Sequence, residues 1–453
     1  MKMYFKIFYE KFKNEFTYLR EENEELPDLL TCDKPNSMEN DTIVRRIPKV
    51  ILQRVEEQNA EYTKENNIHV KVEKVRNMFI NANKCTYEMI KCKMDGKFWN
   101  FLLSHYIEKD IKISSNSWLF NEYYFYQYIN CAYDFENSNY DVFQYEKNDS
   151  INCNRPVIEE ICTCAKRLIE IYNRNEEKKI FCIFFYFALW SNQFDLSWNP
   201  TKNKTEQHKT DEKDIKNKTL REKQFYFNVD NIDKLHNSFY LENILSNDVD
   251  DLYKDIATPA MKWKRFDIVL DNMGVEFITD LCLLYFLTRY FDAVTIHVKK
   301  CPLFVSDTMA KDVHYALDRL CSDERYPNTV FMAKMWKELI NAQKWKIRDD
   351  IYWNMPLPYW VMSTSLLDEL KQSNFVCFKG DANYRRCLGD LNFNFSEPHK
   401  NVLGYFPFRV IALRCLKSPL CCGVEKSIVE ELNKRSSDWS NYGEYAILQY
   451  FSP

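Results

Sequence analysis

The stretch IVLDNMGVEF, Ile268 to Phe277, decides how the second half of the chain is interpreted. It continues the apolar run RFDIVL (265–270), whose β-branched and aliphatic residues predict a buried strand. The run ends at Asp271 and Asn272, followed by Gly274, one of only seven glycines in 453 residues. Such an ending fits an ordinary strand-to-helix turn, since Asp and Asn are common helix caps. It also fits a strand that delivers oxygen ligands to an active site.

From about residue 262 the chain alternates between strand and helix patterns. Further strands are predicted at AVTIHV (293–298), FVCF (375–378), FRVIALR (408–414) and YAILQYF (445–451). Helices are predicted between them at VEFITDLCLLYFLTRY (275–290), MAKDVHYALDRL (309–320), LLDELKQS (366–373) and ANYRRCL (382–388). This alternation predicts an α/β layer with a mostly parallel sheet.

The first half of the chain reads as helical. Apolar residues recur at helical spacing in 42–58, 117–130 and 157–172, and no glycine lies between Gly96 and Gly274. The apolar run IFCIFFYFALW (180–190) is shorter than the roughly 20 residues that a membrane span needs, which predicts a buried helix. We therefore predict a helical subdomain over 1–198, a polar and flexible insert over 199–225, and an α/β catalytic domain over 226–453.

Composition excludes several classes of protein. Hydrophobic residues make up 45% of the chain, charged residues 28%, and the net charge is −4, so no bulk signal points to nucleic acid or an anionic membrane. The N-terminal residues lack the uninterrupted apolar core of a secretory signal, and we expect a cytoplasmic protein, with the nucleus as the alternative. The sixteen cysteines and seven histidines show neither zinc-site spacing nor a disulfide framework. The sequence leaves the oligomeric state open, with a monomer as the default.

Polar side chains follow four of the predicted strands. Asp271, Asn272 and Glu276 follow the first, Asp307 the second, KGDANYRR (379–386) the third, and Lys417 the fourth. Ligands of open α/β sheets bind just beyond the carboxyl ends of the strands. Each segment alone could be a helix cap, an ordinary turn or a solvated lysine, but four of them in one sheet favour a site.

The residue types at these strand ends suggest a chemistry. Asp271, Asn272 and Asp307 offer only oxygen donors, which suit Mg²⁺ or Mn²⁺. Lys379, Arg385 and Lys417 would supply the positive charge that binds a phosphate. The combination predicts metal-assisted hydrolysis of a phosphate ester.

Several motifs, in this order, resemble the metal-dependent damage-control phosphatases. They are RRIPKVI (45–51), LWSNQFDLS (189–197), IVLDNMGVEFITDL (268–281), PLFVSDT (302–308), FKGDANYRRCLGD (378–390), LRCLK (413–417) and WSNYGEYAILQY (439–450). The branch they resemble (subfamily III) includes the eukaryotic sugar-phosphate phosphatases and a protein described as an acidic-residue methyltransferase. The similarity runs from about Ile43 to the end, apart from the polar insert.

The resemblance implies an N-terminal helical subdomain packed on a Rossmann-like α/β/α sandwich. It implies a divalent metal, Mn²⁺ or Mg²⁺ with Co²⁺ or Ni²⁺ as alternatives, held by Asp271, Asn272 and Asp307. Asp271, Asp307 and Lys417 would be the catalytic residues, and the substrate a small phosphorylated metabolite such as fructose 1-phosphate or fructose 6-phosphate. The substrate contacts it implies come from Glu276, Asn192, Asp195, Lys379, Asp381, Asn383, Tyr384, Arg385 and Arg414.

The chain departs from the family pattern at two places. Cys415 replaces the threonine of the R-T-x-K signature. The helix over 117–130 keeps Glu122 but carries Gln127 and Tyr128 where relatives usually carry two arginines, which bears on substrate preference.

Three other functions are alternatives for this sequence. S-adenosylmethionine-dependent carboxyl methylation of a protein is the main alternative, although no glycine-rich loop follows the first strand. Aspartyl-phosphate chemistry of the haloacid dehalogenase kind would need a second acid where Met273 stands. A binding protein without catalysis would be expected to lack the metal ligands, and all three are present.

Overall fold

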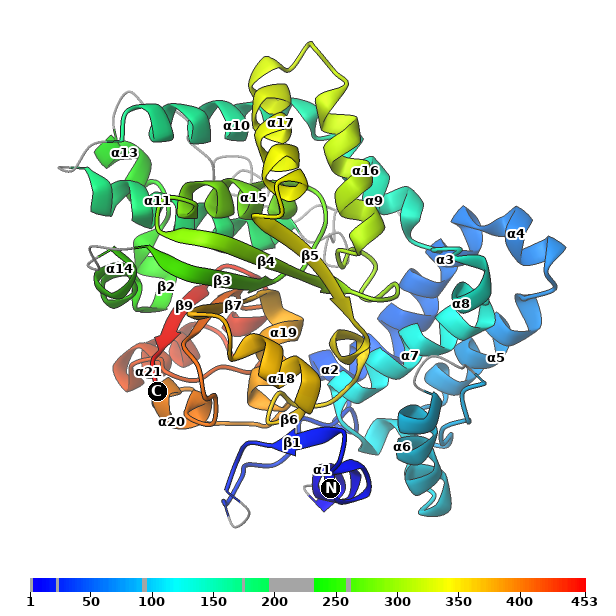
Figure 1. Ribbon diagram of the computed structural model, residues 1–453. Helices are drawn as coiled ribbons and strands as arrows, with labels where there is room; N and C mark the ends of the chain where they lie inside the picture. Colours follow the sequence, from blue (N-terminus) through cyan, green and yellow to red (C-terminus); the bar gives the residue numbers. More distant parts are fainter. Residues whose placement is uncertain (1–2, 22–23, 92–95, 173–175, 195–231, 258–261) are drawn as a thin grey trace.

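The computed structural model describes residues 3–21, 24–91, 96–172, 176–194, 232–257 and 262–453, and its centre is a twisted seven-stranded sheet (Figure 1). The strand order is β2-β9-β8-β7-β3-β4-β5, and every neighbouring pair is parallel except β8 and β9. The strands are β2 (Ile244–Asn247), β3 (Trp263–Val269), β4 (Phe291–Lys299), β5 (Trp345–Asp350), β7 (Phe375–Lys379), β8 (Val410–Cys415) and β9 (Ala446–Phe451).

Helices cover both faces of this sheet, as an α/β/α sandwich requires. One face carries α11 (Glu177–Trp190), α14 (Val249–Ala257), α15 (Val275–Leu287), α16 (Ala310–Cys321) and α17 (Pro327–Asn341), with α10 (Arg155–Glu170) packed on α15 and α17. The opposite face carries α18 (Thr364–Leu370), α19 (Gly380–Leu388) and α20 (His399–Leu403). Alternate residues of β7 enter opposite cores, Phe375 and Cys377 the first and Val376 and Phe378 the second. Burial on both faces explains the continuous apolar runs in the sequence.

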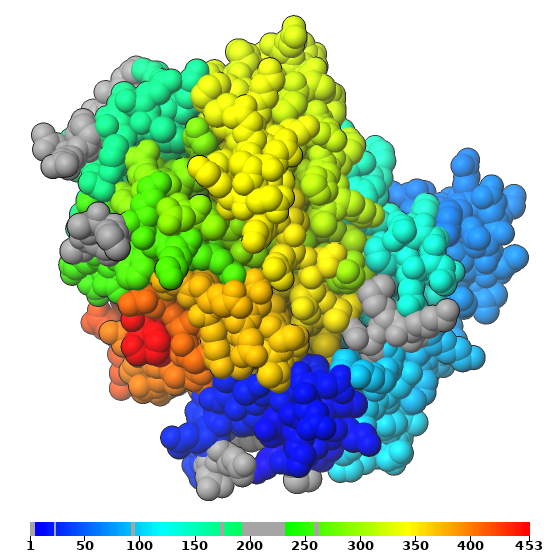
Figure 2. All heavy atoms as spheres, viewed as in Figure 1, coloured from blue at the N-terminus to red at the C-terminus, as the bar shows by residue number. Residues whose placement is uncertain are grey.

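The N-terminal part of the chain is helical, and its atoms lie directly against the C-terminal half (Figures 1 and 2). Among the described residues before 195, the only strand is β1 (Phe16–Tyr18), which pairs antiparallel with β6 (Val361–Ser363). The helices are α1 (Met3–Phe12), α2 (Met38–Asp41), the π-helix η1 (Thr42–Ile51), α3 (Leu52–Gln58), α4 (Ala60–Glu65), α5 (His69–Ile80), α6 (Gly96–Glu108), α7 (Trp118–Ala132), α8 (Phe135–Ser138) and α9 (Gln144–Asn152). The apolar side chains of α1, η1, α3, α5, α6 and α7 share one core with α18, α19 and the second face of the sheet.

The α/β fold class predicted from the sequence is confirmed, and each predicted strand and helix has a counterpart. The elements that the sequence analysis does not predict include β2, α17 and the edge strand β5. Although they precede the proposed boundary at 198, α10 and α11 belong to the core beneath the sheet. The insert predicted at 199–225 lies outside the described residues, and the three-part division stays a prediction.

Two further findings concern the whole of the described chain. None of its cysteines is disulfide-bonded. Within the same residues, no helix combines the length and the apolar character that a membrane crossing requires.

Candidate metal and phosphate site

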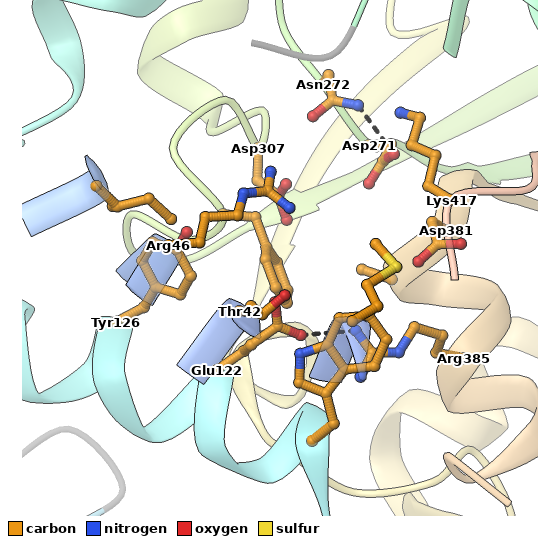
Figure 3. Close-up of a pocket in the computed structure, with 15 residues that line it drawn as sticks. Thr42, Arg46, Glu122, Tyr126, Asp271, Asn272, Asp307, Asp381, Arg385 and Lys417 are labelled. Carbon is orange, nitrogen blue, oxygen red and sulfur yellow. Dashed lines mark hydrogen bonds and ion pairs between the residues drawn. The ribbon is translucent and has the colours of Figure 1, made fainter. Parts of the chain in front are cut away.

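The loops after β3 and β4 are joined to each other by backbone hydrogen bonds, which brings the three predicted metal ligands together. The amide of Thr308 donates to the carbonyl of Asp271 at 2.9 Å, and the amide of Met273 donates to the carbonyl of Ser306 at 2.7 Å. A β-bridge pairs Asn272 with Asp307. The side chains of Asp271, Asn272 and Asp307 consequently line one pocket, which Asp381, Arg385 and Lys417 also line (Figure 3).

Amide side chains hold the Asp271 carboxylate in one orientation. Asn192 Nδ2 donates to Asp271 Oδ2 at 2.9 Å, and Asn272 Nδ2 donates to the same oxygen at 3.0 Å. The two amide groups also donate to Glu276, at 3.0 Å from Asn192 and 2.8 Å from Asn272. Ser306 Oγ in turn donates to Asn272 Oδ1 at 2.6 Å. Glu276 is only 1% exposed and therefore supports the site from behind instead of lining the pocket.

The turn between β7 and α19 passes so close to Asp271 that only glycine fits. Gly380 has a φ of +83°, and a Cβ atom at this position would lie 1.7 Å from Asp271 Oδ2. Gly274, the glycine of the opening stretch, also has a positive φ, at +90°. Both glycines therefore permit the turns predicted from the sequence, and Gly380 in addition makes room for the Asp271 carboxylate.

A second buried network lies beneath Asp307. Lys299 Nζ is 3.5 Å from Asp307 Oδ2 and 3.5 Å from Asn383 Oδ1. Burial lowers the pKa of Lys299, while the nearby Asp307 and Asp271 carboxylates oppose this shift. Asn383 is fixed by the Tyr359 hydroxyl, which donates to its Oδ1 at 2.7 Å. Asn383 thus positions Lys299 and does not line the pocket.

Lys379 lies behind the pocket with two carboxylates. Its ammonium is 3.3 Å from Glu276 Oε1 and 3.0 Å from Asp280 Oδ1, and the side chain is fully buried. One ammonium cannot neutralise two buried carboxylates, and Glu276 has additional amide donors. Burial, reinforced by the neighbouring Glu276 charge, raises the pKa of Asp280 to about 8 despite Lys379.

Arg385 is clamped at the far end of the pocket. It donates to Glu122 Oε2 at 2.6 Å and to Asp390 Oδ1 at 3.0 Å, and its guanidinium lies 3.9 Å from the centre of the Trp118 ring. Burial raises the pKa of Glu122, and Arg385 and Arg46 oppose the shift. Glu122 lines the pocket and Asp390 does not, so the two carboxylates together hold the guanidinium at the pocket wall.

The remaining predicted residues fall at different distances from the pocket. Asp381 lines it and accepts from Arg414 Nε at 2.8 Å, so Arg414 acts through Asp381. Tyr384 points into the protein, where its hydroxyl donates to Gln449 at 2.9 Å. Asp195 lies outside the described residues.

The two departures from the family pattern do not reach the pocket. Cys415 Sγ donates to the Leu189 carbonyl at 3.2 Å, away from the lining. Gln127 lines a separate small pocket with Cys301. Neither it nor Tyr128 is among the described residues that line the candidate site.

Several residues that line the pocket were not predicted as site residues from the sequence. Four come from one helical segment, and three aromatic side chains complete the wall: Met38, Thr42, Arg46, Ile51, Trp118, Tyr126 and Phe304. The sequence signal near Arg46 is the RRIPKVI motif, which indicates a helix and the family resemblance but no role for Arg46 in the site.

The donor set fits a divalent cation. The described residues contain no cluster of three His, Cys, Asp or Glu side chains suited to a metal ion. The candidate centre combines two carboxylates with one amide, and such oxygen-only sets suit Mg²⁺ or Mn²⁺, which keep several waters. The close approach of Gly380 and the amide donors hold the Asp271 carboxylate in one orientation, as a metal ligand requires.

The fold and the pocket define an α/β protein with oxygen donors that suit a divalent ion beside cations that suit phosphate. A family model described as "Damage-control phosphatase ARMT1-like domain" matches residues 42–432, so the chain belongs to this family. It is accordingly a phosphatase, a hydrolase of a metal-dependent family that acts on small phosphorylated substrates.

Individual relatives agree with the family match. "Damage-control phosphatase ARMT1" of Macaca fascicularis is 29% identical over 408 residues, covering 84% of this chain and 86% of that protein. The protein of the same description from Rattus norvegicus is 30% identical and covers 74% of each chain. A solved DUF89 family protein from Pyrococcus horikoshii is 12% identical with a TM-score of 0.43, over 89% of this chain and 97% of the other.

Proposed function

We propose that this chain hydrolyses small sugar phosphates, hexose phosphates such as fructose 1-phosphate or fructose 6-phosphate, with Mn²⁺ or Mg²⁺ held by Asp271, Asn272 and Asp307. The observation that carries the proposal is that these three oxygen donors share one pocket with Lys417. Co²⁺ and Ni²⁺ are alternative ions for the same oxygen donors.

The roles of the chain's own residues follow from their positions. A bound divalent ion would neutralise phosphoryl oxygens and activate a water molecule. Asp271 is held rigid by Asn192 and Asn272, so its carboxylate needs little reorganisation during the reaction. Lys417 lies on the same wall and offers an ammonium to the charge that develops on the phosphoryl oxygens.

Other residues of the pocket lining support a sugar as the organic part of the substrate. Asp381 and Glu122 supply carboxylate acceptors for hydroxyl groups, and Trp118, Tyr126 and Phe304 supply aromatic faces. An aromatic wall with a few fixed polar groups is typical of small-molecule sites. Arg414 and Arg385 already orient the two carboxylates, so they are preorganised to accept hydrogen bonds.

The methyltransferase alternative is not favoured, because the matching family and the relatives are described as phosphatases. The turn after β3 is also filled by Asp271, Asn272 and their amide donors.

The decisive experiment is a phosphatase screen of the purified full chain. Phosphate release from hexose phosphates is measured with Mn²⁺, Mg²⁺, Co²⁺ and Ni²⁺, and with a chelator. We expect metal-dependent hydrolysis of at least one ester, and its loss in Asp307→Asn. Absence of hydrolysis with every metal, or full activity in Asp307→Asn, would show that the proposal is wrong.

A further inference from the structure

The N-terminal wall of the pocket is a helix that changes its pitch. The elements α2, η1 and α3 follow one another without interruption from Met38 to Gln58, and Ser37 caps the first turn by accepting from the Asn40 amide at 3.2 Å. Over Thr42–Ile51 the helix is a π-helix, and at its end the Leu52 amide donates to the Ile47 carbonyl five residues earlier. Short π-helical segments occur often at functional sites.

The larger number of residues per turn decides which side chains face the pocket. Thr42, Arg46 and Ile51 all line it, with spacings of four and five residues. An α-helix has about 3.6 residues per turn and would rotate Ile51 about 140° away from Arg46. A π-helix, with hydrogen bonds from residue i to i+5 and roughly 4.4 residues per turn, keeps all three on one face.

The surrounding residues explain why the π-helix persists. Pro48 lies inside it and has no N–H group to donate to an earlier carbonyl. Arg76 of α5 donates to the Pro48 carbonyl and also pairs with Glu73 at 3.0 Å and with Glu56 of α3. These contacts fix η1 to the neighbouring helix, so Arg46 projects from a rigid support.

The charges of the pocket suggest what Arg46 binds. Glu122 and Asp390 already neutralise Arg385, and Arg414 neutralises Asp381. The lining also holds Asp271, Asp307, Lys417 and Arg46, so two cationic side chains share the pocket with the proposed metal ligands. A phosphate group bound at those ligands would therefore have an ammonium and a guanidinium in the same pocket.

We propose that Arg46 is a substrate-binding residue that donates to the phosphate group from η1, opposite Lys417. The inference rests on the proposed function in taking a phosphate ester as the substrate. Figure 3 shows the two side chains reaching into the pocket from opposite sides, with Asp307 and Asp271 between them. A guanidinium suits this place because it offers several N–H donors in one plane to phosphate oxygens.

The test compares two adjacent arginines. Arg46→Gln removes the charge from the pocket, whereas Arg45→Gln removes one from the exposed side of the same helix, where Arg45 is 58% exposed and pairs with Asp41 at 2.6 Å. Binding of inorganic phosphate to the full chain in the presence of Mn²⁺ is measured by calorimetry. Arg46→Gln should weaken binding roughly 10- to 100-fold, as expected for the loss of charge-assisted hydrogen bonds, and Arg45→Gln should leave it within twofold.

Kinetic measurements distinguish substrate binding by Arg46 from a purely structural role. For an ester that the wild type hydrolyses, kcat/KM of Arg46→Gln should fall by a similar factor, and Arg46→Lys should recover part of the loss. Added guanidinium ion should partly restore Arg46→Gln but have no effect on Arg45→Gln. Lack of rescue together with unchanged phosphate binding would overturn the proposal.

A measurement on the wild type covers the case in which the variants do not fold. Phosphate should protect Arg46, but not Arg45, from phenylglyoxal, as read by mass spectrometry. Equal modification of Arg46 with and without phosphate would overturn the inference. If no ester is hydrolysed but phosphate protects Arg46, the proposed function fails and this inference stands. If an ester is hydrolysed but phosphate does not protect Arg46, the proposed function stands and this inference fails.

Discussion

Replacing Gly380 with alanine should disable the metal site by displacing a carboxylate. The new Cβ would lie 1.7 Å from Asp271 Oδ2, and ordinary contact begins at 3.4 Å, so the carboxylate must move by about 1.7 Å. A metal–oxygen bond tolerates roughly 0.2 Å. The hydrogen bonds from Asn192 and Asn272 oppose any compensating shift. We expect affinity for Mn²⁺ to fall at least about 100-fold, the upper range for disturbing residues behind the ligands.

Gly423→Ala provides the matched control. Gly423 has a φ of +76°, close to the +83° of Gly380, and a Cβ there would approach Gln449 Nε2 at 2.6 Å, away from the pocket lining. Both variants should lose about 1–3 kcal/mol of unfolding free energy from backbone strain, measured by urea titration. Only Gly380→Ala should lose Mn²⁺ affinity in calorimetry. Unchanged Mn²⁺ binding by folded Gly380→Ala would refute the assignment of Asp271 as a ligand.

Three other predictions concern the supporting structure. The folded-state pKa of Asp280, about 8, lies above its ordinary value of 3.8, so the folded chain holds an extra proton between these values. Unfolding free energy should therefore decrease as pH rises from about 4 to 8. Asp280→Asn should flatten this slope in urea titrations, and an unchanged slope would refute the assignment. Lys379→Met leaves Glu276 and Asp280 without their ammonium and should cost about 3–5 kcal/mol of unfolding free energy; a loss below 1 kcal/mol would contradict this. Deleting 201–223 should change unfolding free energy by less than about 1 kcal/mol and leave hydrolysis intact, whereas loss of activity would give the insert a role in the site.

The fold could be predicted largely because buried parallel strands leave a strong local signal. Strands such as β7 are apolar on both faces, so they read as uninterrupted hydrophobic runs. The edge strand β5, WKIRDD, has one buried residue and several exposed charged ones, and therefore carries no such signal. The antiparallel direction of β9 depends on its pairing with β8, which a sequence pattern does not encode.

The part of the candidate site that could be predicted from the sequence is the part that follows the strands of the sheet. Asp271 and Lys417 come shortly after β3 and β8, and Asp307 lies in the loop after β4, so their sequence positions mark the same edge of the sheet. Arg46 comes from a helix more than 220 residues earlier in the sequence than Asp271, and its orientation depends on a π-helical pitch that helical periodicity does not reveal. The side of the pocket formed by N-terminal helices therefore required the three-dimensional arrangement.

The position of Lys379 shows why the pocket needs a cation from the N-terminal half. Lys379 ends strand β7 and carries the right charge, but its ammonium lies between Glu276 and Asp280, at 3.3 and 3.0 Å. Drawing it toward a phosphate would leave the buried Glu276 carboxylate without its cation, a loss of the order of 3–5 kcal/mol. Lys379 therefore stabilises Glu276, which in turn receives the amide donors that also hold Asp271. The positive charge at the phosphate must come from elsewhere, and in the described lining Lys417 and Arg46 are the cations placed to supply it.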